Sequence, residues 1–83
     1  MDKKTAKRIA DTMAQSLPNT ENDALYLGQI NDEHIFYFKR TIHGGHIGLP
    51  PYYSVKDSGS IALIKDTEIL LKALKLKQKI KGV

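Results

Sequence analysis

Apolar residues recur at helical spacing near both ends of the chain. Near the N-terminus they follow i, i+3, i+4, i+7 spacing and predict a helix over residues 3–17, with Asp2 as its N-cap. Near the C-terminus a similar stripe predicts a helix that begins at Asp66 and runs to about Lys79. The pattern leaves the end of this second helix open, because apolar residues and lysines also alternate with period two from Leu74 onward.

Four segments between the predicted helices have the short apolar pattern of strands. They are residues 24–30, 34–40, 52–56 and 60–64. Asn31-Asp32 predicts a two-residue hairpin turn, since both residue types tolerate positive φ. Asp57-Ser58-Gly59 predicts a second tight turn. Strand 34–40 is apolar on both faces, so we expect it to be central in the sheet.

The order of these elements predicts an α+β fold. We expect a small two-layer domain in which an antiparallel meander of three to four strands is flanked by an N-terminal and a C-terminal helix, both on one face. A chain of 83 residues has room for a single domain, residues 1–83. The predicted core consists of Ile9, Met13, Leu25, Leu27, Phe36, Phe38, Val55, Ile61, Leu63, Leu70 and Leu74.

An arrangement with both helices on one face leaves the other face of the sheet uncovered. The alternation of the first hairpin places four apolar residues there, Tyr26, Ile30, Ile35 and Tyr37. An uncovered apolar face usually contacts a partner, and a second copy of the chain is the simplest one. The sequence therefore predicts a homodimer or a contact with another protein.

Composition excludes several classes of protein. A hydrophobic content of 41% and a charged content of 27% are typical of a globular chain with a mild net charge, here +4. The absence of cysteine excludes disulfides, thiolate metal sites and a cysteine nucleophile. No apolar run approaches the roughly 20 residues that span a bilayer, and no signal-peptide core follows Met1. We expect a cytoplasmic protein with no membrane association and no cofactor.

The segment from Thr41 to Tyr53 concentrates glycine, proline, histidine and tyrosine. Such a segment predicts a shaped loop, and loops of this kind often carry binding sites. His43 and His46 have the spacing of metal ligands and are also candidates for the acid and base of phosphodiester cleavage. No complete ligand set or catalytic constellation accompanies them, so we predict neither a metal site nor catalytic residues. The candidate binding residues are Lys39, Arg40, His43, His46, Tyr52 and Tyr53.

The strand pattern also predicts the exposure of Tyr52, Tyr53 and His34. Tyr52 and Tyr53 point to opposite faces if they lie in a strand, so one belongs to the core and the other lies at the surface or under a partner. His34 follows the predicted hairpin turn and is expected to be an exposed cross-strand residue.

The sequence is consistent with two classes of function. The lack of a complete catalytic constellation favours a small non-enzymatic protein-interaction or regulatory module. The alternative is a nucleic-acid-binding protein or small ribonuclease that uses the His43/His46 loop and a basic surface formed by lysines of both helices lying side by side. The element order resembles that of double-stranded-RNA-binding and small toxin ribonuclease domains, and the resemblance implies no residue role. Residues 19–38 carry four acidic and no basic residues, which argues against a nucleic-acid surface there.

Overall fold

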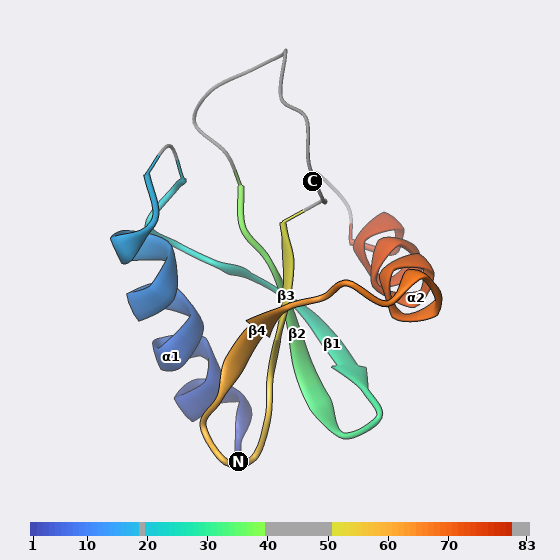
Figure 1. Cartoon of the computed structure of the whole chain (residues 1–83), viewed down its shortest axis with the longest axis horizontal. Helices are drawn as coiled ribbons and strands as arrows, with labels where there is room; N and C mark the ends of the chain where they lie inside the picture. Colours follow the sequence, from blue (N-terminus) through green and yellow to red (C-terminus); the bar gives the residue numbers. More distant parts are fainter. Residues whose placement is uncertain (19, 40–50, 81–83) are drawn as a thin grey trace.

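An antiparallel sheet between two helices makes up the part of the chain that the computed structural model describes, residues 1–18, 20–39 and 51–80. The four strands are hydrogen-bonded in their sequence order (Figure 1). The predicted α+β class, with a meander flanked by an N-terminal and a C-terminal helix, is confirmed. The elements are α1 (Lys3–Ser16), β1 (Leu25–Ile30), β2 (Glu33–Tyr37), β3 (Tyr52–Val55), β4 (Ile61–Leu63) and α2 (Thr67–Gln78).

Both predicted tight turns are confirmed by the backbone. Asn31 and Asp32 have φ of 52° and 65°, the left-handed conformation that a two-residue hairpin needs at both positions. Gly59 has φ of 91° in the turn between β3 and β4, where its N–H donates to the Lys56 carbonyl over 2.8 Å. These local signals set how neighbouring strands pair.

Aspartates begin both helices, as predicted. The Asp2 carboxylate accepts the N–H of Thr5 over 2.8 Å, and this hydrogen bond lowers the pKa of Asp2. Asp66 accepts the N–H groups of Glu68 and Ile69 at the start of α2. The alternation of apolar residues and lysines therefore lies within a helix, which ends at Gln78.

The two helices lie on opposite faces of the sheet, which corrects the expectation that both cover one face of a two-layer domain (Figure 1). Phe36 belongs to the cluster beneath α1, whereas its neighbour Ile35 belongs to the cluster beneath α2. Adjacent residues of a strand point to opposite faces, and both of these are almost completely buried. The result is three layers, and the uncovered face that motivated the predicted homodimer is occupied by α2.

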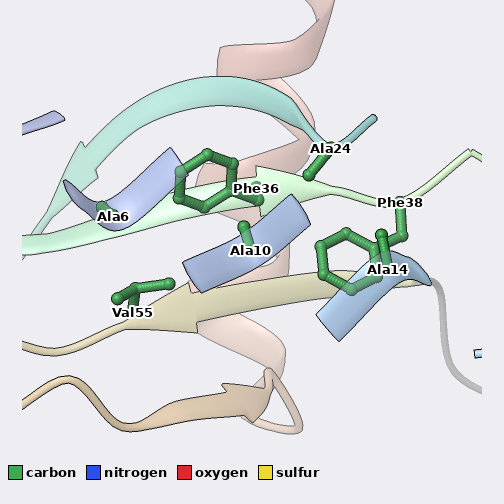
Figure 2. Close-up of a cluster of buried hydrophobic side chains, with 7 residues drawn as sticks. All are labelled: Ala6, Ala10, Ala14, Ala24, Phe36, Phe38 and Val55. Atoms are coloured by element: carbon green, nitrogen blue, oxygen red, sulfur yellow. The ribbon is translucent and has the colours of Figure 1, made fainter. Parts of the chain in front are cut away.

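Small side chains bring α1 close to the sheet. Ala6, Ala10 and Ala14 recur every four residues and are all fully buried. They face an apolar cluster that includes Phe36 and Phe38 (Figure 2). Larger apolar residues of α1 pack around the edges of this contact. Close approach of backbone to aromatic rings gives the dense packing typical of protein interiors.

A bulge in β1 changes which residues share a face. The register with β2 shifts between Tyr26 and Gly28, so Ile30 lies on the α2 side with Leu27, and not with Tyr26 as predicted. Gly28 has φ of 141°, and a methyl carbon of Leu76 lies 3.5 Å from the position that a Cβ would occupy there. The bulge and its glycine thus allow α2 to pack closely against β1.

The predicted core is confirmed in part. Leu27, Phe36, Phe38 and Val55 are buried, and Leu74 is exposed. The expectation that Leu74 is a core residue is therefore wrong. The other predicted core residues are half-buried: Ile9, Met13, Leu25, Ile61, Leu63 and Leu70.

His34 is buried, with 3% of its surface exposed, which corrects its predicted exposure. Its Nε2 lies 3.0 Å from the Met1 carbonyl oxygen and its Nδ1 lies 3.0 Å from the Tyr26 hydroxyl. A carbonyl only accepts hydrogen bonds, so Nε2 donates to Met1, and in the neutral ring Nδ1 then accepts from the Tyr26 hydroxyl. The ring contacts Met1, which precedes α1. The alternation of apolar and polar residues within β2 does not reveal this contact.

We expect Ala10→Leu to destabilise the fold, because a larger side chain would push α1 away from the sheet. The free energy of unfolding should fall by about 2 kcal/mol, as measured by urea denaturation. The control is Gln15→Leu, which places the same side chain on the exposed side of α1. Equal stability of the two variants would contradict close packing of α1 through its alanines.

Candidate functional site

Of the predicted binding residues, the structure describes Lys39, Tyr52 and Tyr53, and it does not gather these three into one site. Arg40, His43 and His46 lie outside the described residues, so their role stays a prediction. Lys39 is half-buried, and its carbonyl accepts the N–H of Glu21 over 2.8 Å. The two tyrosines point to opposite faces, as their position in a strand predicts.

Tyr53 belongs to the α1 side of the sheet, where its ring stacks on that of Phe38. The ring centroids are 4.3 Å apart and the planes are inclined by 14°. This geometry is that of aromatic packing at the edge of a core. We therefore assign Tyr53 a role in the fold.

Tyr52 belongs to the α2 side and is 4% exposed. Its ring lies 5.2 Å from that of Tyr37, over which the Lys77 ammonium is placed at 4.1 Å. Burial raises the pKa of the Tyr52 hydroxyl, and the charge of an ionised Tyr37 raises it further. Among Lys39, Tyr52 and Tyr53, the predicted binding residues within the described ranges, Tyr52 is thus the one that belongs to the cluster between α2 and the sheet.

An apolar depression of about 240 Å³ lies beside Tyr52 on the flank of α2. We call the residues that line it the leucine face: Tyr52, Thr67, Leu70, Leu71 and Leu74. Leu71 is 55% exposed and Leu74 is 41% exposed. The depression is smaller than a usual small-molecule site. Its size suits an apolar side chain of another protein.

Helical geometry explains why two leucines of α2 face outward. Residues two apart on a helix differ in direction by about 200°. Leu76 packs against the sheet at Gly28, so Leu74 is directed away from it. The apolar residues of α2 between Ile69 and Leu76 cover roughly 220° of the helix, more than the sheet can bury. The width of this apolar arc, which can be read from the sequence, indicates that part of it stays at the surface.

A row of exposed lysines runs beside the leucine face. Lys72, Lys75 and Lys79 follow i, i+3, i+7 spacing, and we call them the lysine row. Lys72 and Lys75 each come directly after an exposed leucine of α2. The two rows therefore lie about 100° apart on the helix and run in parallel along it.

The basic residues of α1 are on the other side of the sheet, so the predicted basic surface shared by both helices is wrong. Lys7 also binds the carboxylates of Asp11 and Asp23. Partial burial by itself would lower the pKa of Lys7, but hydrogen bonds to these two carboxylates raise it overall. Asp11 in turn accepts the Ala24 N–H over 2.9 Å, which ties α1 to the start of β1.

Neither the described residues nor similarity to known proteins assigns a function to this chain. No group of three or more histidine, cysteine or acidic side chains within residues 1–18, 20–39 and 51–80 is placed to hold a metal ion. In the same ranges, no helix combines the length and the apolar character that crossing a membrane requires. The chain matches no protein-family model, and neither a curated protein nor a solved structure is significantly similar to it.

We expect Tyr52→Phe to reduce the loss of stability at high pH. The folded-state pKa of Tyr52 is raised, so the unfolded chain loses this proton first, near pH 10. Tyr52 therefore stabilises the fold below about pH 10 and loses that contribution as pH rises through its folded-state pKa. Urea unfolding at about pH 8 and about pH 11 should show a smaller decrease for the variant. Parallel decreases would contradict the burial of this hydroxyl.

Proposed function

We propose that this chain is a small non-enzymatic protein-interaction module that binds its partner through the leucine face. The supporting observation is the exposure of Leu71 and Leu74 in a fold where both faces of the sheet already carry a helix. The leucines extend beyond what α2 needs to cover the sheet. A cytoplasmic location belongs to the same proposal, because a chain without cysteine requires no oxidising compartment.

The energetics of burial support a protein as the partner. Fully burying one leucine side chain contributes about 1.5–3 kcal/mol. Leu71 is 55% exposed and Leu74 is 41% exposed, so covering the rest of both side chains contributes about as much as fully burying one leucine. Tyr52, Thr67 and Leu70 form the rest of the depression, and Tyr52 and Leu70 are held by packing between α2 and the sheet. A partner side chain would therefore enter a preformed site with little loss of conformational entropy.

Nucleic-acid binding by α1 alone is the second candidate. Its support is three exposed cations in the first two turns of that helix, Lys3, Lys4 and Arg8, of which Lys3 lies over the Tyr26 ring. The candidate is weaker because Lys7 is paired with carboxylates and the lysines of α2 lie across the sheet. Absence of binding to generic RNA and DNA at about 50 mM salt, where phosphate contacts are strong, would remove it.

We expect Leu71→Gln combined with Leu74→Gln to abolish partner binding while changing stability by less than about 1 kcal/mol. Both side chains are exposed, and glutamine keeps a good helix propensity. Affinity capture from extract of the native cell, compared by mass spectrometry, should show proteins that the unsubstituted chain retains and the double variant loses.

The matched control is Lys4→Gln with Arg8→Gln, which alters two exposed side chains on the opposite side of the sheet. This control should retain the same proteins as the unsubstituted chain. If the control loses them and the leucine variant keeps them, the binding surface is α1 and the proposal is wrong.

A further inference from the structure

Building on the proposed function, we infer that the partner of the leucine face is an acidic amphipathic helix of another protein. Its apolar side chains would contact Leu71 and Leu74, and its carboxylates would contact the lysine row. The inference deepens the proposal by naming the chemistry of the partner. It is carried by charge complementarity, the geometry of the two rows and the size of the depression.

The charge on this flank of α2 is of one sign over most of its length. Lys72, Lys75 and Lys79 are exposed along about two turns, and Glu68 is the acidic residue at the start of the same row. A partner with acidic residues at matching spacing meets these lysines without like-charge contacts. A basic partner would place cation against cation at each turn.

The spacing of the leucines matches that of a helical ligand. Leu71 and Leu74 are three residues apart, a rise of about 4.5 Å along α2. Apolar residues at i, i+3 and i+4 of a second helix present anchors at the same spacing. The depression of about 240 Å³ has room for one such anchor between α2 and Tyr52. One turn of the partner helix would thus place an apolar side chain in the depression. The carboxylates of the neighbouring turns would contact the lysine row.

A second copy of this chain fits the same surface less well. An antiparallel pairing of two copies through the leucine face brings their two lysine rows together, and in any pairing each copy carries a charge of +4. Like charges across an interface oppose association. The charge of the surface therefore favours an acidic partner over self-association.

The test uses two synthetic peptides of equal length that form amphipathic helices with leucines at i, i+3, i+4 and i+7. One peptide carries glutamate and the other carries lysine at the positions flanking the leucines. Fluorescence anisotropy at low salt should show that the glutamate peptide binds this chain at least about tenfold more tightly. Binding should weaken at higher salt. Equal affinity for both peptides, or no binding of either, would overturn the inference.

Two variants separate the charges from the leucines. Lys72→Glu with Lys75→Glu should reverse the preference, so that the lysine peptide becomes the tighter ligand. Leu71→Gln with Leu74→Gln should abolish binding of both peptides. Lys4→Glu with Arg8→Glu makes the same change of charge on α1 and should leave the preference intact. Loss of preference in this control would show that net charge alone selects the peptide, which overturns the inference.

Other occupants give distinct results. If captured proteins depend on Leu71 and Leu74 but not on Lys72 and Lys75, the interaction module stands and the acidic partner is wrong. A dimer in sedimentation that the leucine variant abolishes would assign the surface to a second copy. Leucine-dependent binding to vesicles of anionic phospholipid, without peptide binding, would assign it to a membrane surface. Each of these three results contradicts the inference.

Discussion

Burial on both faces of β2 is the constraint on which the rest of this structure depends. Ile35 and Phe36 are neighbours in the strand, point to opposite faces and are both almost completely removed from solvent. Each face must therefore carry a helix, because a sheet in water cannot leave such a residue exposed without losing about 1.5–3 kcal/mol of stability. A domain with only two helices meets this requirement by placing one on each side, as Figure 1 shows.

The two helices meet the sheet by different means, and this difference produces the leucine face. The N-terminal helix lies on the central strands through its alanines, so its contact surface is narrow and its outward face is polar. The C-terminal helix packs mainly against β1, an edge strand, where Gly28 admits the side chain of Leu76. Its position toward that edge leaves the flank near Tyr52 open. The depression thus exists because the bulge in β1 allows α2 to pack toward the edge of the sheet.

Local features of this fold follow from sequence, whereas the placement of faces does not. The turn at Asn31-Asp32 and the caps at Asp2 and Asp66 depend on residues within a few positions, and all three were predicted. The side on which Ile30 lies depends on the bulge at Gly28, which a strict alternation does not contain. The burial of His34 depends on Met1, far away in sequence. Of the candidate site, only Tyr52 was foreseen, because Leu71 and Leu74 belong to an apolar arc whose buried part is decided by packing.

The alternation of apolar residues and lysines in the C-terminal segment has a single physical interpretation once that segment is a helix. On a strand, such a pattern would divide one apolar face from one charged face. On a helix, a step of two residues turns the direction by about 200°, so Leu74 and Leu76 point to opposite sides. One leucine then stabilises the domain against Gly28, and the other stays at the surface. Lys75, the residue between them, points in a direction between these two and therefore lies beside the exposed leucines. The pattern that obscures the helix in the sequence is the one that places an apolar row next to a cationic row on its surface.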